Sequence, residues 1–290
     1  MAVKILKLKC LINDRDAEKL AGTYLDDSSY DTLVKEDTDA YDLYGNLLFK
    51  FRKNVIPYEV IKLGYDSFKD SIELTDGRGM AAGGNSLRIK KDGTVSKISV
   101  AKKVYSGNVG NMNAGAMISY CRRTAFARAH FDKYTQGIPF VQYIDGLYKE
   151  LCEDYYRRQI NVAKATNQNY VIGGTSFTTV TVNKNFQTAV HKDSGDYPKG
   201  FGNLCVYREG SYDGSYFVLP QYKVAVDLHT GDMLFANVHK WHGNTNFKDC
   251  SEDYLRIAFV CYYRDYMLQC KSPKEELARV KQEKNGYLKL

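Results

Sequence analysis

Three residues in the second half of the chain have the types and spacing of a metal site. His191 and Asp193 form an H-x-D pair at the end of an expected strand, and His242 follows in the segment Trp241-His-Gly-Asn244. Residues two apart on a strand face the same side, so His191 and Asp193 can bind one ion. Two histidines and one carboxylate are the ligand set of Fe(II) oxygenases, and this set leaves positions open for a co-substrate and O₂. The spacing therefore predicts an iron centre.

A neighbouring histidine is the alternative third ligand. His239 lies three residues before His242. We prefer His242 because the turn-like pair Gly243-Asn244 follows it and because its separation from Arg256 fits the family pattern described below. The same residue types also allow a zinc hydrolase, and a sugar-binding or structural jelly roll would need no such site.

An arginine beyond His242 has the chemistry to hold the co-substrate. Arg256 begins the last expected strand. A 2-oxoglutarate that chelates iron through its keto-acid end leaves its distal carboxylate inside the barrel, and a planar guanidinium binds a carboxylate with two parallel hydrogen bonds. Arg256 is therefore the predicted anchor, and Arg264 is the next candidate.

These residues lie in a half of the chain that predicts strands. The segments after Gly173 are rich in Val, Thr, Tyr and Phe, many of them alternate, and glycine-containing turns separate them. Strands of this number and spacing are typical of a sandwich or a double-sheet jelly roll. The expected strands are 177–183, 188–192, 203–209, 216–219, 223–228, 232–238 and 255–263.

The first half of the chain has mainly helical patterns. Apolar residues recur at helical spacing over 56–69, 113–134 and 140–164, and the first ten residues alternate like an edge strand. A charged final helix is expected over 273–288. The predicted fold class is α+β, with a mainly helical region with edge strands over 1–172 and a jelly-roll catalytic core with a C-terminal helix over 173–290. We expect the two regions to form one compact unit.

Composition limits the class of protein. The hydrophobic content is 44% and the charged content 26%, as in ordinary globular proteins. No run of eighteen apolar residues occurs, so no membrane span is expected. The seven cysteines form no C-x-x-C pair. A zinc ribbon and a disulfide scaffold are therefore not expected, and the predicted location is the cytoplasm.

Positive charge is concentrated in one segment. The net charge is +7, which suits a polyanionic partner such as DNA. The segment 86–103 holds six basic residues against one acidic residue, and it is either a solvated hairpin or an edge that contacts phosphates. Its candidate DNA-binding residues are Lys90, Lys91, Lys102 and Lys103. The preceding loop, 76–85, is rich in glycine, which suggests a close backbone approach, but it lacks the ending of a nucleotide-phosphate loop.

Six short motifs occur in an order that resembles a known family, the TET/base-J-binding-protein dioxygenases. The likeness is strongest to bacteriophage and microbial members and covers about 175–264. The helical half resembles the family only loosely. The motifs are 186–196, 200–204, 210–220, 224–228, Gly231-Asp232 and 239–244.

The resemblance implies an activity and a set of site residues. Family members use Fe(II), 2-oxoglutarate and O₂ to oxidise the 5-methyl group of 5-methylcytosine or thymine in DNA. It implies a double-stranded β-helix core in which His191, Asp193 and His242 bind iron and Arg256 binds 2-oxoglutarate. A polar residue three positions after the metal Asp lies near the target base in the family. Here that residue is Asp196, which is otherwise a turn-stabilising residue.

A DNA substrate would have to enter the site as a flipped base, because an iron inside a barrel cannot reach a stacked one. The basic excess could hold the phosphates, and some of the 24 tyrosines could stack on bases, although sheet packing explains most of them. Two alternatives remain: an oxygenase acting on a free small molecule or a protein side chain, and a nucleic-acid-binding module with an inactive metal site. The sequence predicts no particular oligomeric state.

Overall fold

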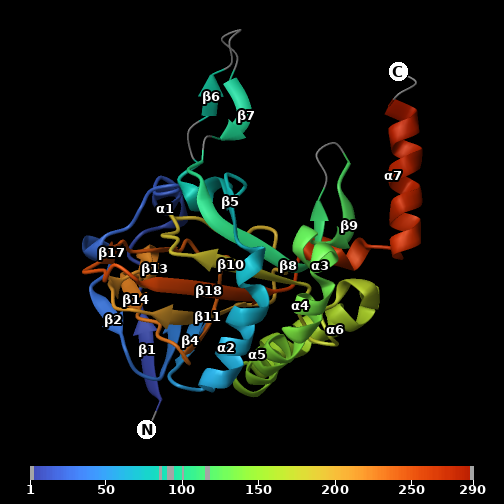
Figure 1. Ribbon diagram of the computed structural model, residues 1–290. Helices are drawn as coiled ribbons and strands as arrows, with labels where there is room; N and C mark the ends of the chain where they lie inside the picture. The colour runs from blue at the N-terminus through green and yellow to red at the C-terminus, as the bar shows by residue number, and fades with distance from the viewer. Residues whose placement is uncertain (1–2, 85–86, 90–94, 100, 115–117, 288–290) are drawn as a thin grey trace.

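A large mixed sheet forms the framework of the molecule. The computed structural model describes residues 3–84, 87–89, 95–99, 101–114 and 118–287. In this part of the chain the largest sheet has ten strands in the order β1-β3-β4-β15-β11-β18-β10-β8-β5, with β9 paired to β8 (Figure 1). Its strands are β1 (Lys4–Leu8), β3 (Thr38–Asp42), β4 (Leu47–Arg52), β5 (Glu73–Thr75), β8 (Val104–Ala114), β9 (Tyr120–Arg123), β10 (Thr179–Lys184), β11 (Gly202–Glu209), β15 (Met233–Ala236) and β18 (Leu255–Tyr262).

A smaller sheet faces the large one and completes the jelly roll. It has the order β16-β13-β14-β2. Phe217 and Val224 of this sheet belong to the same buried cluster as Phe49, Val206 and Leu234 of the large sheet, so the two sheets pack face to face. The remaining strands are β2 (Thr32–Val34), β13 (Phe217–Leu219), β14 (Val224–Val226), β16 (Gly243–Asn244), and the two-stranded pairs β6 (Leu87–Ile89) with β7 (Val95–Ser99) and β12 (Asp213–Gly214) with β17 (Phe247–Lys248).

Helices cover the other face of the large sheet. Ile61 of α2 and Phe140 of α5 join Val180 of β10 and Phe259 of β18 in one buried cluster, and Figure 1 shows α2 crossing in front of β18. The helices are α1 (Asp14–Glu18), α2 (Tyr58–Phe68), α3 (Ala125–Ala129), α4 (Phe131–Gln136), α5 (Ile138–Leu151), α6 (Glu153–Ala165) and α7 (Pro273–Tyr287); short 3₁₀ turns are η1 (Asp27–Ser29), η2 (Lys69–Ser71), η3 (Gly79–Ala82), η4 (Gln168–Tyr170), η5 (Pro220–Tyr222) and η6 (Asp265–Gln269).

Alternation along β18 assigns its side chains to two different environments. Ile257 and Phe259 pack under the helices, whereas Arg256 and Ala258 line a cavity between the two sheets. Side chains in a strand alternate between faces, so one strand supplies both the core and the site. The same period places Thr181 of β10 in the cavity.

The predicted α+β class and jelly-roll core are confirmed, and so is the N-terminal edge strand, which is β1. The helix predicted over 113–134 is wrong in its first part. There β8 continues to Ala114 and pairs with β9, and helix begins only at Ala125, after Thr124 accepts a hydrogen bond from the Ala127 N–H as a cap. Pairing between β8 and β9 overrides the local helical pattern at 113–114 and 120–123, and residues 115–117 of the predicted helix lie outside the described residues.

The region before residue 173 contains more strand than the sequence indicated. Strands β1, β3, β4, β5 and β8 all come from this region, and they lie in the same sheet as β10, β11, β15 and β18. Residues on both sides of the expected boundary therefore share one hydrogen-bonded framework.

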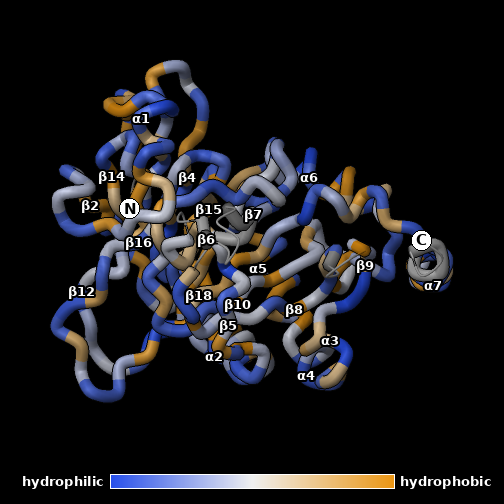
Figure 2. Tube along the Cα trace, turned by 90° about the horizontal axis from the view of Figure 1, so that it is seen from above, coloured by the Kyte–Doolittle hydropathy of each residue, from blue (hydrophilic) through white to orange (hydrophobic). Residues whose placement is uncertain are grey.

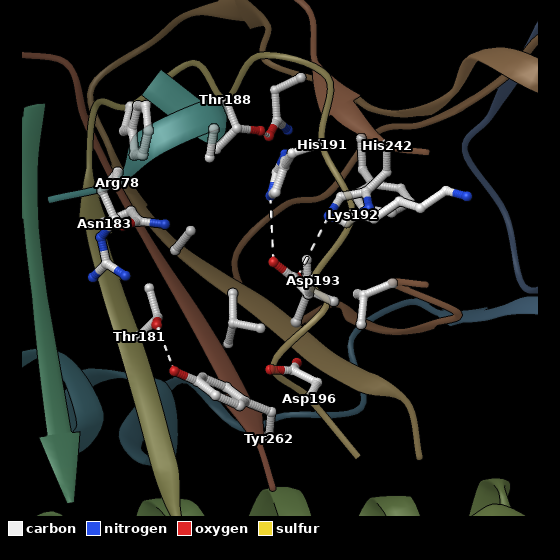
Figure 3. A pocket seen from close by; sticks show the side chains of 18 of the residues that line it. Arg78, Thr181, Asn183, Thr188, His191, Lys192, Asp193, Asp196, His242 and Tyr262 are labelled. Carbon is white, nitrogen blue, oxygen red and sulfur yellow. Dashed lines mark hydrogen bonds and ion pairs between the residues drawn. The ribbon is translucent and has the colours of Figure 1, made fainter. Parts of the chain in front are cut away.

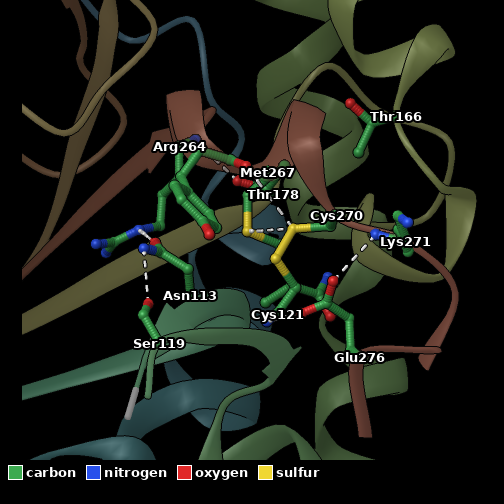
Figure 4. Close-up of a disulfide and its surroundings, with 12 residues drawn as sticks. Asn113, Ser119, Cys121, Thr166, Thr178, Arg264, Met267, Cys270, Lys271 and Glu276 are labelled. Atoms are coloured by element: carbon green, nitrogen blue, oxygen red, sulfur yellow. Dashed lines mark hydrogen bonds between the residues drawn. A yellow bond between two sulfur atoms is a disulfide. The ribbon is translucent and has the colours of Figure 1, made fainter. Parts of the chain in front are cut away.

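One disulfide was not expected from the sequence. Cys121 of β9 and Cys270 after η6 form a disulfide with their Cα atoms 5.8 Å apart (Figure 4). The two cysteines are 149 residues apart, so only the packing of the hairpin β8–β9 against the C-terminal segment brings them together. Within the described residues no helix has the length and apolar character needed to cross a membrane.

Candidate metal centre and active-site cavity

The cavity between the two sheets has a volume of about 470 Å³. Its walls come from β10, β11 and β18 of the large sheet, from β13 and β16 of the small sheet, and from the loop that contains His191. Apolar side chains such as Leu204, Val206 and Phe217 line one part, and polar side chains line the rest. A cavity with an apolar wall and converging polar groups is the usual form of a ligand site.

His191, Asp193 and His242 meet in this cavity. One ligand atom from each lies within 4.8 Å of the others. The His191 Nε2 is 3.5 Å from one carboxylate oxygen of Asp193, and the His242 Nε2 is 3.6 Å from the other, as Figure 3 shows. The cluster therefore offers two imidazole nitrogens and a carboxylate to one point.

The backbone fixes the two histidines side by side. The His191 N–H donates to the His242 carbonyl at 2.9 Å, and the His242 N–H donates to the His191 carbonyl at 3.0 Å. This two-bond bridge holds the imidazole rings with their centroids 4.3 Å apart. Gly243 permits it, because a Cβ at that position would lie 3.1 Å from the Thr188 carbonyl oxygen.

Backbone carbonyls also select the tautomer of each ring. The Nδ1 of His191 is 2.8 Å from the Ala189 oxygen, and the Nδ1 of His242 is 2.9 Å from the Lys240 oxygen. A carbonyl can only accept, so each Nδ1 carries the proton and each Nε2 keeps a lone pair toward the cluster. This is the form of histidine that binds metals.

Electrostatic effects within the cluster agree with a cation site. Burial acts to raise the pKa of Asp193, but the adjacent imidazoles hold it well below its usual range. Burial and the neighbouring His191 lower the pKa of His242. Burial acts in the same direction on His191, but Asp193 outweighs it and raises the pKa of His191. An ionised carboxylate beside a neutral imidazole fits a divalent metal, and the two-histidine, one-carboxylate set fits Fe(II).

The rival ligand His239 lies apart from this cluster. Its Nε2 is 3.1 Å from the Tyr197 carbonyl oxygen, and it is not among the three residues whose ligand atoms converge. The geometry thus brings His242, and not His239, to His191 and Asp193.

Arg256 lies in the same cavity and is 6% exposed. In the described part of the chain no carboxylate oxygen lies within 4.0 Å of the Arg256 guanidinium nitrogens, the distance of an ion pair. Burial lowers the pKa of its guanidinium, and Tyr212 acts in the opposite direction. A buried arginine without a carboxylate partner is costly unless it receives an anion, so this position suits the distal carboxylate of 2-oxoglutarate.

Asp196 lies at the polar end of the cavity, near Asp193 (Figure 3). Its backbone forms an antiparallel bridge with Arg264, which also lines the cavity. Burial and the Asp193 charge raise the pKa of Asp196 well above its usual range, against the influence of Arg264. The side chain is thus placed where it can meet a substrate.

Arg78 is a charged cavity residue that the sequence analysis did not single out. Arg78 projects from the glycine-rich loop and donates to the Ser106 hydroxyl at 2.6 Å, the Gly107 carbonyl at 2.9 Å and the Asn108 amide oxygen at 3.1 Å. All three partners are uncharged, and burial lowers the pKa of Arg78. The glycine content of loop 76–85 was the only indication in the sequence. It predicted that the loop backbone comes close to another group, but not that the loop lies at the active-site cavity.

Other polar groups also line the cavity: Thr181, Asn183, Thr188, Asn244 and Tyr262. Thr188 and Asn244 lie in the family motifs 186–196 and 239–244, whereas no motif marked the other three. The Tyr262 hydroxyl lies 3.4 Å from the Thr181 hydroxyl. Strand alternation alone could have suggested Thr181 and Asn183 together on one face, but not which face lines a cavity.

The candidate DNA-binding lysines are only partly described. Lys102 and Lys103 are exposed, and the Lys102 ammonium lies 4.5 Å from the centre of the Tyr24 ring. Lys90 and Lys91 lie outside the described residues.

Comparison with known proteins agrees with the fold and the cavity. The architecture is that of a 2-oxoglutarate- and Fe(II)-dependent oxygenase. The Tet_JBP family model, described as the oxygenase domain of the 2OGFeDO superfamily, matches residues 109–265, and the chain belongs to this family. The expected enzyme class is confirmed, with Fe(II), 2-oxoglutarate and O₂ as its cofactor set. The match starts in β8, so it includes much of the helical half of the chain. The sequence motifs had shown only a loose resemblance between that half and the family.

Two curated relatives are kinetoplastid proteins. The thymine dioxygenase JBP1 of Trypanosoma brucei brucei is 30% identical over 251 residues, which cover 82% of this chain and 28% of the relative. The bifunctional helicase and thymine dioxygenase JBP2 of Trypanosoma brucei brucei (strain 927/4 GUTat10.1) is 36% identical over 174 residues, which cover 56% of this chain and 16% of the relative. The chain thus spans less than a third of the length of these relatives.

A solved structure shows the same fold. The structure of NgTET1 in complex with 5mC DNA superposes with a TM-score of 0.56 at 17% sequence identity and covers 86% of both chains. The correspondence therefore includes the helices and strands of both halves.

Proposed function

We propose that this chain oxidises the 5-methyl group of a pyrimidine base, 5-methylcytosine or thymine, in DNA. In this proposal His191, Asp193 and His242 hold Fe(II), and Arg256 holds the distal carboxylate of 2-oxoglutarate. Both relatives described above are named thymine dioxygenases, and the similar solved structure contains 5mC DNA. Their substrates and the fold support the assignment of the substrate class.

The single observation that carries the proposal is the content of the cavity. It holds the three-residue cluster, the buried Arg256, and a separate polar end with Asp196. An oxygenase needs room for a co-substrate and a substrate at one metal, and a cavity of about 470 Å³ is within the range of small-molecule sites.

The chemistry divides between the cofactors and the chain. Bound Fe(II) supplies the activation of O₂, and in the overall reaction 2-oxoglutarate becomes succinate and CO₂ while one oxygen atom enters the methyl C–H bond. The chain contributes position: Arg256 orients the co-substrate by a bidentate contact, and the carbonyls that accept from each Nδ1 keep the two histidines in their binding form. The apolar side chains of Leu204, Val206 and Phe217 exclude water from the part of the cavity that they line.

The base would enter as a flipped nucleotide. The cluster lies inside the jelly roll, so a stacked base in a duplex cannot reach it. We propose that Asp196 contacts the Watson–Crick edge of the flipped base, where a carboxylate can accept from the exocyclic amine of cytosine or from the N3–H of thymine. From the cysteine pattern of the sequence we propose a cytoplasmic location, which is the host cytoplasm if a phage encodes the chain; the Cys121–Cys270 disulfide is unusual in that compartment.

Product analysis tests the proposal directly. The protein is incubated with Fe(II), 2-oxoglutarate and duplexes that contain 5-methylcytosine or only thymine, the DNA is digested, and nucleosides are identified by mass spectrometry. A hydroxymethyl nucleoside is expected, and none with His242→Ala. If the DNA stays unchanged while a free small molecule or a protein side chain gains oxygen, the enzyme class stands and the DNA substrate is wrong.

A further inference from the structure

A second cavity lies outside the jelly roll, beside the disulfide. Its volume is about 400 Å³, and its walls come from β9, α3, η4 and α7. Both overall views place β9, α3 and α7 on the same side of the molecule, away from β2 (Figures 1 and 2). We name it the arginine pocket after Arg122, Arg123 and Arg128, which line it.

The three arginines are not neutralised by the protein. Among the described residues, no carboxylate oxygen lies within 4.0 Å of the guanidinium nitrogens of these three arginines, the distance of an ion pair. The nearby carboxylate of Glu276 is 5% exposed and is already engaged: it accepts from the Cys121 N–H at 3.0 Å and lies 3.2 Å from the Arg279 guanidinium. The pocket therefore carries a net positive charge that is available to an anion.

Aromatic rings hold two of these guanidinium groups in place. Arg122 donates to the Tyr120 hydroxyl at 2.9 Å and lies 4.8 Å from the centre of the same ring. Arg123 lies 4.7 Å from the centre of the Phe131 ring. Stacking on a ring orients a guanidinium without using all five of its N–H donors, so donors remain for a ligand.

A buried hydroxyl in the wall of the pocket also lacks a partner. Tyr170 is 2% exposed, and its hydroxyl has no hydrogen-bond partner among the described residues. That oxygen has almost no accessible surface, so Tyr170 forms part of the pocket wall with its ring, and its hydroxyl does not face a ligand.

The arginine pocket is connected to the polar end of the active-site cavity. Arg264 lines that cavity and donates to the Asn113 side chain at 3.1 Å, and Asn113 lies 3.4 Å from the Ser119 hydroxyl (Figure 4). Asn113 is also the cross-strand partner of Cys121, which lines the arginine pocket. Asn113 thus lies between Arg264 of the active-site cavity and Cys121 in the wall of the arginine pocket, so the hairpin β8–β9 joins the two cavities.

We propose that the arginine pocket binds a backbone phosphate of the DNA strand whose flipped nucleotide occupies the active-site cavity. This inference rests on the proposed function and specifies where the strand is held. Planar guanidinium groups bind phosphate oxygens in pairs, and phosphate contacts set the register of a protein on DNA without reading sequence. The exposed Arg123 and Arg128 suit a long polyanion that passes over the surface.

The main test is a salt titration of DNA binding. The triple variant Arg122→Gln/Arg123→Gln/Arg128→Gln is compared with a control of equal charge change at exposed positions on other elements, Arg15→Gln/Lys35→Gln/Lys149→Gln. Each lost phosphate contact should reduce the slope of log K against log salt by about 0.9. We expect a clear decrease for the pocket variant, equal for methylated and unmethylated duplexes, and little change for the control.

The Tm separates a ligand contact from a structural role. Arg123 and Arg128 are exposed, so the Tm of Arg123→Gln/Arg128→Gln should stay at the level of the control variant, whereas its salt slope should fall. A fall in Tm with an unchanged salt slope would show a structural role and overturn the assignment.

The outcomes distinguish this inference from the proposed function. Salt slopes equal to those of the control, together with normal base oxidation, would overturn the pocket assignment and leave the function standing. If inorganic phosphate binds the wild-type pocket while the DNA affinity of the pocket variant equals that of the control, the pocket is a site for a small anion. That result would also overturn the pocket assignment. A reduced slope supports the pocket as a DNA contact even if no oxidised base is detected, because binding is measured without turnover.

Discussion

The two cavities of this protein use positive charge in opposite ways. In the active-site cavity Arg256 is buried, and the histidines are fixed by hydrogen bonds to backbone carbonyls. In the arginine pocket Arg123 and Arg128 are exposed and lie on a hairpin and a short helix. Buried charges are little screened by salt and hold one geometry, whereas exposed charges are screened and tolerate many. The difference matches the two proposed roles, a site for reaction and a surface that holds a polymer.

The largest effect on activity is expected from substitution of the three proposed iron ligands. His191→Ala, Asp193→Ala or His242→Ala should each abolish base oxidation, because two histidines and one carboxylate leave no spare ligand. Succinate formation and nucleoside products are the measurements, and the Tm should show that the fold is kept. His239→Ala is the matched control and should retain activity. Activity that survives in His242→Ala but is lost in His239→Ala would reverse the assignment of the third ligand.

A smaller but still large effect is expected at Arg256. Arg256→Lys keeps the charge but loses the planar two-bond contact, and one charge-assisted hydrogen bond is worth about 1.5–3 kcal/mol. The 2-oxoglutarate concentration for half-maximal succinate formation should rise about ten- to hundredfold. Arg264→Lys, at the other end of the cavity, should leave this titration unchanged. If only Arg264→Lys shifts it, Arg264 is the anchor.

Substitution of Asp196 tests whether this residue contributes to recognition of the base and not to binding of 2-oxoglutarate. Asp196→Ala should nearly preserve DNA binding and 2-oxoglutarate affinity but reduce base oxidation or alter its preference between 5-methylcytosine and thymine. The reason is that the contact forms only after the base has left the stack. Product ratios on the two duplexes are the measurement, with Asp196→Asn as the conservative comparison. An unchanged product profile in both variants would leave Asp196 a turn residue.

The smallest effect is expected from the lysines. Neutralising Lys90, Lys91, Lys102 and Lys103 together should weaken binding to all DNA sequences alike and flatten the salt dependence by about 0.9 per lost phosphate contact. The 2-oxoglutarate titration should not change. The comparison is a variant that neutralises four exposed lysines elsewhere: Lys9, Lys19, Lys35 and Lys149. Equal slopes in the two quadruple variants would show that the segment does not contact phosphates.

Local patterns were informative where the chemistry is carried by few residues in one segment. The H-x-D pair occupies one short segment, and the alternation of β18 places Arg256 on the cavity face. The alternation and turn residues of the second half predicted a jelly roll, because a half-buried strand must alternate. Helix α2 followed from its apolar period and from Pro57 at its start. These features depend on residues that are close in sequence, so they could be predicted before the structure was known.

Features that depend on contacts between separate segments came from the packing of the whole chain. The first part of the segment predicted as helix contains the end of β8 and strand β9, because these two strands pair with each other and a local helical pattern does not reveal that pairing. The packing brought Cys121 to Cys270, and Arg78 from the glycine-rich loop into the active-site cavity. It placed His242 rather than His239 beside His191, through two backbone hydrogen bonds between residues 51 positions apart on the chain. Cavities lie between elements, so their content is set by packing and not by the order of residues in any one segment.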